Sequence, residues 1–207
     1  MTSSKPTTEP HTPARSPMRA RFREQVREDV KAAALRQLAQ GGAAAISVNA
    51  IAKQLGVSGP ALYRYFANRD ELLAELVIDA YHDLAAELAT ATDRELGLSP
   101  GERLRAFATA WRGFAQSEPH RYQLLFTPPL PGYDAHSEPL VTASQTVMTA
   151  ALAVLEDERQ ILSAWTRLHG FVTLELGGNF ASMGIDADVL FAGEVAAIVD
   201  AAPTSDQ

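Results

Sequence analysis

The chain has 207 residues and no cysteine, which excludes disulfide bonds, thiolate metal sites and cysteine catalysis. Hydrophobic residues make up 46% of it and charged residues 21%, proportions that are ordinary for a globular protein. No apolar run approaches the ~20 residues that a membrane span requires, and the N-terminus carries no apolar signal-peptide core. We therefore expect a cytoplasmic protein without a membrane partner.

The net charge of −7 is divided unevenly along the chain. Residues 1–70 carry 11 Lys and Arg against 5 Asp and Glu, a net of +6, whereas residues 71–207 carry a net of −13. Such a division would orient the N-terminal third toward a polyanion such as DNA and keep the remainder away from it. The alternative is that uneven charge simply keeps both parts solvated.

Residues 1–18 are predicted to form a disordered tail, because prolines recur there among Ser and Thr. A run of arginines from Arg15 to Arg27 follows at the start of the first predicted helix, about residues 20–40. This run could reach a DNA backbone or an adjacent minor groove, and a solvated basic tail is the alternative. The apolar spacing of the helix predicts a buried side that begins at Phe22.

The most informative stretch is 47–66, SVNAIAKQLGVSGPALYRYF. Its first half has one apolar helical stripe, made of Val48, Ile51, Ala52 and Leu55. Gly56 lies where that helix should end, and a second helix is predicted from Gly59 to Phe66 with Pro60 in its first turn. Two short helices around a turn predict a helix-turn-helix, whose second helix enters the DNA major groove. On this pattern alone, a small hairpin in any all-α protein is an equal alternative.

Residues 23–76 resemble the DNA-binding domain of the tetracycline-repressor (TetR) family of bacterial transcription regulators. The resemblance is carried by five motifs in order: Gly41-Gly42, Ser47 with Val48-x-x-Ile51-Ala52, Gly56-Val57-Ser58, Leu62-Tyr63-x-Tyr65-Phe66, and Arg69-Asp70-Glu71-Leu72-Leu73. Tyr65 and Arg69 depart from the commonest family pattern, where His and Lys are frequent. Both side chains can still donate a hydrogen bond to a phosphate oxygen.

The resemblance implies a set of DNA contacts. Phosphates are expected to be held by Ser47, Tyr63, Tyr65 and Arg69. Base edges are expected to face Ser58, Gly59, Pro60, Ala61 and Arg64. Three of these five carry no hydrogen-bonding side chain, so direct readout should depend on Arg64, Ser58, contact with thymine methyl groups and DNA shape.

The pattern after this stretch predicts a long connecting helix over residues 68–92. Asn68 as N-cap and Glu71 three residues later form a capping-box-like pair, and an apolar stripe runs on toward Leu88. The start of this helix would lie against the helix-turn-helix (19–67) and its end in the following domain. A binding event in that domain could therefore move the second helix of the motif.

Residues 93–207 predict a second all-helical domain, so the expected fold class is all-α: a three-helix DNA-binding domain plus a C-terminal helical bundle. Its helices are predicted at about 100–117, 119–126, 137–155, 157–177 and 187–201. The segment from Trp165 to Gly170 resembles the motif of the WHG-type C-terminal domain found in a subset of the TetR family. That resemblance implies a homodimer in which residues 157–180 and 186–202 pack against their copies in a second subunit.

Aromatic residues in the C-terminal domain suggest a pocket for a small molecule. The candidate lining is Trp111, Phe114, Tyr122, Phe126, Met148 and His169. The family resemblance implies that an inducer would bind there, whereas the alternative for each residue is that it fills the core. No cofactor and no metal ion are expected.

The sequence therefore predicts a dimeric DNA-binding transcriptional regulator, a repressor that a small-molecule ligand releases from a near-palindromic operator. One alternative is a dimeric small-molecule-binding protein that does not bind DNA. An enzyme is the other, but His169 and Glu175 diverge by about 240° around one helix and cannot cooperate within a subunit. The chain has no phosphate loop, nucleophile elbow or paired-His metal motif.

Overall fold

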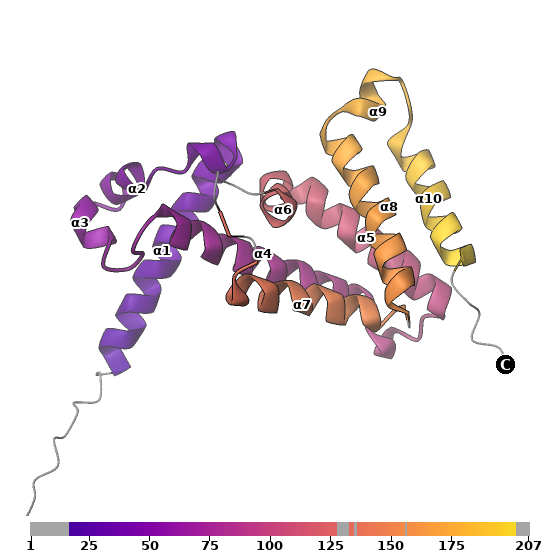
Figure 1. Ribbon diagram of the computed structural model, residues 1–207, viewed down its shortest axis with the longest axis horizontal. Helices are drawn as coiled ribbons and strands as arrows, with labels where there is room; N and C mark the ends of the chain where they lie inside the picture. Colours follow the sequence, from indigo (N-terminus) through magenta and orange to yellow (C-terminus); the bar gives the residue numbers. More distant parts are fainter. Residues whose placement is uncertain (1–16, 128–132, 135, 156, 202–207) are drawn as a thin grey trace, which may run out of the picture.

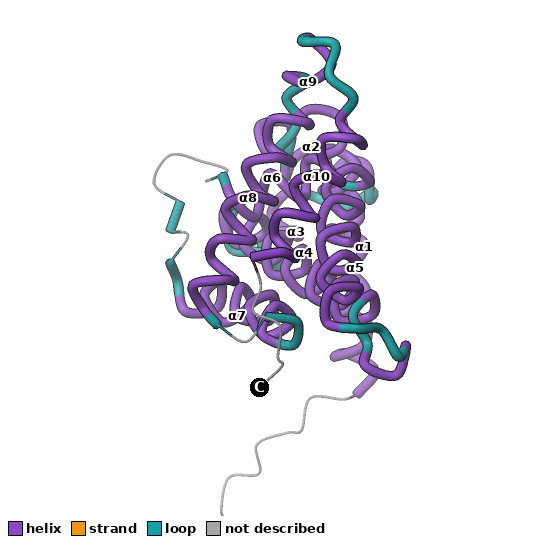
Figure 2. The backbone as a smooth tube through the Cα atoms, turned by 90° about the vertical axis from the view of Figure 1, so that its right-hand side faces the viewer, coloured by secondary structure: helices purple, strands orange, loops and turns teal. Residues whose placement is uncertain are grey.

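The computed structural model describes residues 17–127, 133–134, 136–155 and 157–201. These residues form ten α-helices and two single 3-10 turns, and they contain no strand, so the predicted all-α class is confirmed (Figures 1 and 2). The predicted disordered tail, apart from its last two residues, and most of the Pro-rich loop after Thr127 lie outside the described part of the chain.

The N-terminal head consists of α1 (Pro17–Gly41), η1 (Ala43–Ala45), α2 (Val48–Gln54) and α3 (Gly59–Leu62). Its core is formed by side chains that are buried from all three helices, among them Val30, Ala34, Leu38, Ile51, Leu62 and Phe66. Because the first two turns of α1 project beyond this core, Phe22 is 65% exposed (Figure 1). The prediction that Phe22 belongs to the buried side of the first helix was wrong.

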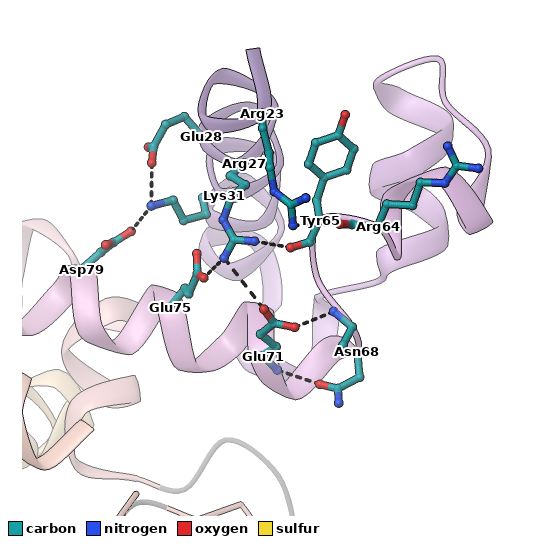
Figure 3. A network of polar contacts seen from close by, with 11 residues as sticks. Arg23, Arg27, Glu28, Lys31, Arg64, Tyr65, Asn68, Glu71, Glu75 and Asp79 are labelled. Carbon is teal, nitrogen blue, oxygen red and sulfur yellow. Dashed lines mark hydrogen bonds and ion pairs between the residues drawn. The ribbon is translucent and has the colours of Figure 1, made fainter. Parts of the chain in front are cut away.

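The second helix of the motif is shorter than predicted. The α-helix ends at Leu62, and residues 63–65 continue as a tighter turn in which the Tyr65 amide donates to the Leu62 carbonyl at 2.9 Å. Such i to i+3 bonds are the usual way in which a helix end tightens. The carbonyls of Arg64 and Tyr65 are left free of the helix, and arginine side chains of α1 take them as acceptors (Figure 3).

The predicted connecting helix is α4 (Arg69–Ala91), which runs from the head into the C-terminal part (Figure 1). Its N-cap is Asn68, whose side-chain oxygen accepts from the Glu71 amide at 2.8 Å. The Glu71 carboxylate in turn accepts from the amide of Ala67, one residue before the cap, so the predicted capping pair forms in a slightly shifted version. One face of α4 is buried along its whole length, from Leu72 to Leu88.

The part of the chain that follows α4 is called the body. It begins with η2 (Arg94–Leu96). Its helices are α5 (Pro100–Ser117), α6 (Pro119–Phe126), α7 (Glu138–Leu152), α8 (Glu158–Leu176), α9 (Asn179–Ser182) and α10 (Ala187–Ala201). Helix α4 packs against α5, α6 and α7, while α8 and α10 lie side by side at the end of the molecule opposite α3 (Figure 1).

Local sequence explains how these helices begin. Ser99 and Glu102 form a capping box at the start of α5, with reciprocal hydrogen bonds of 2.8 and 3.3 Å between each side chain and the other residue's amide. The short helix α9 was not predicted. It follows Gly178, whose φ of 72° is a left-handed conformation that favours glycine and redirects the chain between α8 and α10.

Candidate nucleic-acid interface and ligand cavity

Two exposed serines cap the helices of the helix-turn-helix. The Ser47 hydroxyl accepts from the Ala50 amide and begins α2, and the Ser58 hydroxyl accepts from the Ala61 amide and begins α3, both at 3.3 Å. A serine that accepts a capping bond still has its own hydroxyl proton to donate. Both predicted site residues are therefore placed with a free donor at the surface of the head.

The outward face of α3 and the turn after it is formed by Pro60, Tyr63 and Arg64, all of which are exposed. Gly59 and Ala61 are half-buried, because α3 packs against α2 at that point. A Cβ atom at Gly59 would lie 3.2 Å from the side-chain oxygen of Asn49, which is a tight approach. Gly59 is therefore explained by the packing between the two helices, whether or not it also approaches a base.

Arg64 is the predicted base-reading side chain, and it points away from the polar network beneath it (Figure 3). Its carbonyl accepts from Arg23 at 3.1 Å, but its guanidinium makes no hydrogen bond or ion pair with any described residue. Five N–H donors on a planar group are thus available at the surface. This is the arrangement that bidentate readout of guanine requires.

Two of the four predicted phosphate contacts, Arg69 and Tyr65, are half-buried, and the phenolic hydroxyl of Tyr65 makes no hydrogen bond with a described residue. The Arg69 guanidinium donates to the Ala43 carbonyl, which fixes η1 against the start of α4. The Arg23 guanidinium lies 5.8 Å from the ring centroid of Tyr65. Only Ser47 and Tyr63 present exposed side chains, Tyr63 with 47% of its surface accessible. Spacing along the sequence could not show that the other two are half-buried.

The body contains a cavity of about 370 Å³ that opens between α4, α5, α6, α7 and α8. Its lining is mostly apolar and includes Tyr81, Phe107, Trp111, Phe126, Val147, Met148, Ala151, Leu155, Ile161, Trp165 and Leu168. Three of the six predicted pocket residues, Trp111, Phe126 and Met148, belong to it.

The other three predicted pocket residues, Phe114, Tyr122 and His169, do not line this cavity. Tyr122 and Phe114 are almost completely buried, and Phe114 packs under the guanidinium of Arg121. The Tyr122 hydroxyl accepts from the indole N–H of Trp111 at 3.2 Å and lies 2.9 Å from Nδ1 of His169. Burial raises the pKa of Tyr122 and lowers that of His169, so both favour their neutral forms in this hydrogen-bonded chain behind the cavity wall.

Several lining residues were not predicted, among them Phe107, Trp165 and Leu168. A signal was available for the first, because Phe107 lies four residues before Trp111 and so shares its helix face. Leu168 is buried on α8, whereas Trp165 is 40% exposed at the edge of the cavity.

Two family models match the chain in the regions just described. Residues 31–76 match the model of bacterial regulatory proteins of the tetR family, and residues 104–198 match a tetracyclin repressor-like C-terminal domain. The crystal structure of SCO4313, described as a regulatory protein, is 36% identical, covers 87% of this chain and 98% of its own, and superposes with a TM-score of 0.77. The chain belongs to the tetR family.

Two further proteins to which the chain is similar are also named as regulators. A transcriptional regulator of the HTH type from Mycobacterium tuberculosis, Rv1816, is 46% identical over 100 residues, which are 48% of this chain and 43% of that protein. The match thus spans less than half the length of that curated relative. A tetR-family regulatory protein from Rhodococcus RHA1 shares the fold, with a TM-score of 0.60 over 87% of this chain and 98% of its own, at 16% identity.

Two further properties of this tetR-family chain are the length and hydropathy of its helices and the grouping of side chains of the types that bind metal ions. None of the helices in the described part is both long and apolar enough to cross a membrane. The same residues contain no cluster of three or more His, Asp or Glu side chains that could hold a metal ion.

Proposed function

We propose that the chain is a DNA-binding transcriptional regulator that acts as a homodimeric repressor. The observation that supports this most strongly is the exposed Arg64 guanidinium in the turn after α3, which has no partner among the described residues. Tyr63 and Pro60 are exposed as well, on a head with a net positive charge. Phosphates would be held by Ser47 and Tyr63, and base edges would be read by Arg64 and Ser58.

The dimer is proposed to form through α8 and α10, because one short recognition element per chain contacts too few base pairs for a specific site. Leu174 of α8 and Val189 of α10 are 47% and 70% exposed. Beside them, a Cβ atom at Gly170 or Gly193 would meet nothing within 4 Å. Apolar side chains next to open backbone suit close packing against a second copy of the same helices.

The cavity is proposed to bind an uncharged, largely apolar small molecule whose occupancy releases the DNA. Its lining contains no Asp, Glu, Lys or Arg. The polar lining groups are mostly engaged already: Tyr81 donates to the Leu125 carbonyl, Trp111 to Tyr122 and Ser144 to the Val141 carbonyl. A charged ligand would lose its hydration there without finding a partner, which is costly.

DNA binding is tested by selecting duplexes from a random pool with the full chain and then titrating the selected duplex over a range of salt. The proposal expects a near-palindromic site whose affinity falls steeply with salt, with a log–log slope of about −0.9 for each phosphate contact. Failure to enrich any duplex would contradict it. Ligand binding without DNA binding would instead favour the alternative of a dimeric small-molecule-binding protein.

Ligand binding has a built-in reporter, because both tryptophans of the chain line the cavity. Naphthalene-2-carboxamide and naphthalene-2-carboxylate are matched in size and differ in charge. We expect the amide to change the tryptophan fluorescence and to release the selected duplex more strongly than the carboxylate does. Equal responses to the two compounds, or none, would contradict an uncharged effector.

An enzyme is disfavoured by where its candidate groups lie. His169 is held in the hydrogen-bonded chain with Tyr122 and Trp111. Glu175 accepts from Nε and Nη2 of Arg112, whose side chain is 12% exposed and also pairs with Asp188 at 2.7 Å. His169 and Glu175, the two candidate bases, therefore each have a structural partner on another helix.

A further inference from the structure

A row of carboxylates lies along one face of α4, spaced four residues apart: Glu71, Glu75, Asp79 and Asp83. Residues at this spacing are neighbours on one side of a helix. Each of these carboxylates has a cationic partner on a different helix, and the partners are Arg27, Lys31 and Arg121. The row therefore connects α4 both to α1 of the head and to α6 of the body.

Arg27 makes the most connections in this row. Its guanidinium pairs with Glu75, lies 3.9 Å from Glu71 and donates to the carbonyl of Tyr65 (Figure 3). The same group lies 4.3 Å from the ring centroid of Phe66, and its side chain is only 17% exposed. One planar side chain thus contacts α4 and the segment that directly follows α3 at the same time.

The neighbouring cations of α1 reinforce this arrangement. Arg23, one turn before Arg27, donates to the Arg64 carbonyl at 3.1 Å. Lys31, one turn after it, pairs with Asp79 at 2.9 Å and with Glu28 at 2.7 Å. Burial by itself lowers the pKa of Lys31, but these two carboxylates outweigh burial and raise it above its ordinary value, so the ammonium stays charged.

The other end of the row reaches the cavity. Asp83 pairs with Arg121 of α6, and the Tyr81 hydroxyl donates to the Leu125 carbonyl of α6 at 2.8 Å. Tyr81 also lines the cavity. A change in the cavity that moves α4 at Tyr81 would therefore be carried along one helix to the carboxylates that Arg27 contacts.

We propose that Arg27 is a positioning residue, which ties the carbonyl end of α3 to Glu71 and Glu75 so that the orientation of α3 follows that of α4. The inference rests on the proposed function in one respect, that α3 reads DNA. Arg27 itself does not contact DNA in this account. Its donors are used within the protein. A guanidinium can make this connection because its planar group of N–H donors can contact a carbonyl and two carboxylates at the same time.

The connection that Arg27 makes between the segment after α3 and α4 is called the tie below. It is tested first without DNA, by amide hydrogen exchange of the full chain. Arg27→Met and Glu75→Met should both accelerate exchange across residues 62–68, because each removes one side of the connection. Glu87→Met is the matched control, since Glu87 is exposed on the same helix and has no described partner. Unchanged exchange in both Arg27→Met and Glu75→Met would overturn the proposal.

The second test measures affinity for the selected duplex. Removing an acidic group near DNA would by charge alone strengthen binding, so the proposal makes the opposite prediction: Glu75→Met lowers affinity roughly tenfold, as Arg27→Met does. The double variant should lose little more than either single one. Stronger binding by Glu75→Met would overturn the proposal.

Two further results separate positioning from a direct phosphate contact. Arg27→Met should leave the salt slope unchanged, whereas loss of a phosphate contact would reduce it by about 0.9. Arg27→Lys keeps the charge but loses the planar group of N–H donors, and it should fail to restore the affinity. Full rescue by Lys together with a smaller slope in Arg27→Met would overturn the proposal.

Failure of the proposed function can be told apart from failure of the tie. If the unaltered chain binds no duplex, the proposed function falls, and hydrogen exchange decides the tie alone. Faster exchange at residues 62–68 in Arg27→Met and Glu75→Met, with none in Glu87→Met, would then still support it. If the chain binds DNA and exchange is unchanged, the proposed function stands and the tie falls.

Discussion

Both ends of α4 are buried on one face, but its head end carries three of the four carboxylates whose ion pairs reach another helix. Its first three turns contact the head through Glu71, Glu75 and Asp79, whose cationic partners lie on α1. Its last turns contact the body through side chains such as Leu84 and Leu88, which have no exposed surface. Ion pairs and hydrogen bonds depend on the distance and angle between their partners. The free energy of apolar burial is instead proportional to the buried area and depends little on direction.

This difference implies a division of labour between orientation and stability. A few directional contacts set how α3 lies on α4, and removing one should change DNA binding more than it changes unfolding. The apolar contacts of the body contribute most of the folding free energy. Removing one of them should therefore change the free energy of unfolding more than it changes DNA binding. The following substitutions separate these two effects, beginning with the largest.

The largest effect is expected from Leu84→Ala in the body half of α4. Truncating a fully buried leucine should lower the free energy of unfolding by about 2–5 kcal/mol, through lost burial and the cavity left behind. Urea unfolding followed by circular dichroism measures this change. Glu87→Ala, three residues away on the exposed side, should change it by less than about 0.5 kcal/mol. Similar losses in the two variants would contradict the comparison.

A smaller effect, confined to DNA binding, is expected from Arg64→Ala. Binding to the selected duplex should weaken by about 1–3 kcal/mol, with little change on random duplexes, because a base contact is lost. The unfolding midpoint should stay the same, since the Arg64 guanidinium has no partner within the described residues.

Tyr63→Phe is the companion variant for a phosphate contact. It should weaken the selected and the random duplex about equally. Fluorescence anisotropy with the two duplexes measures both variants. Equal losses on both duplexes from Arg64→Ala as well would show that Arg64 holds the backbone and does not read bases.

Loss of a helix cap should cost about 1 kcal/mol. Ser58→Ala removes the acceptor of the Ala61 amide at the start of α3, and N-cap substitutions of this kind cost about 0.5–2 kcal/mol. Ser58→Asp keeps the acceptor and should retain the stability, while its charge should weaken DNA binding. If Ser58→Asp is as unstable as Ser58→Ala, the capping role of Ser58 is refuted.

The smallest effect concerns pH and His169. Burial lowers the pKa of His169, so the unfolded chain binds a proton near pH 6.5 that the folded chain does not. The contribution of His169 to stability is therefore full above about pH 6.5 and is lost as pH falls below that value. His169→Gln should show a smaller fall in melting temperature between pH 7.5 and pH 5.5. An unchanged pH dependence would contradict the assignment.

Much of the fold could be predicted from sequence, because its signals are local. The caps Ser47, Asn68 and Ser99 mark three helix starts in the structure, and the apolar stripe of α4 was predicted over its full length. Phe22 shows the limit of such reasoning. Its spacing is that of a buried residue, but among the described residues no other element covers it, and it is 65% exposed.

The candidate site was harder to predict because it depends on side-chain direction across helices. Trp111 and Phe114 lie on one helix and differ in role: Trp111 faces the cavity, whereas Phe114 packs under Arg121. The tie made by Arg27 could not be predicted at all. It joins residues 38 to 48 positions apart, through a backbone carbonyl that follows the end of α3.

The account depends most on two copies of α3 contacting one duplex in successive major grooves. Footprinting of the selected duplex, together with the mass of the complex by analytical ultracentrifugation, tests this directly. We predict two protected patches about 10 base pairs apart, or a multiple of that spacing, with two chains for each pair of patches. A single protected patch bound by one chain would contradict it.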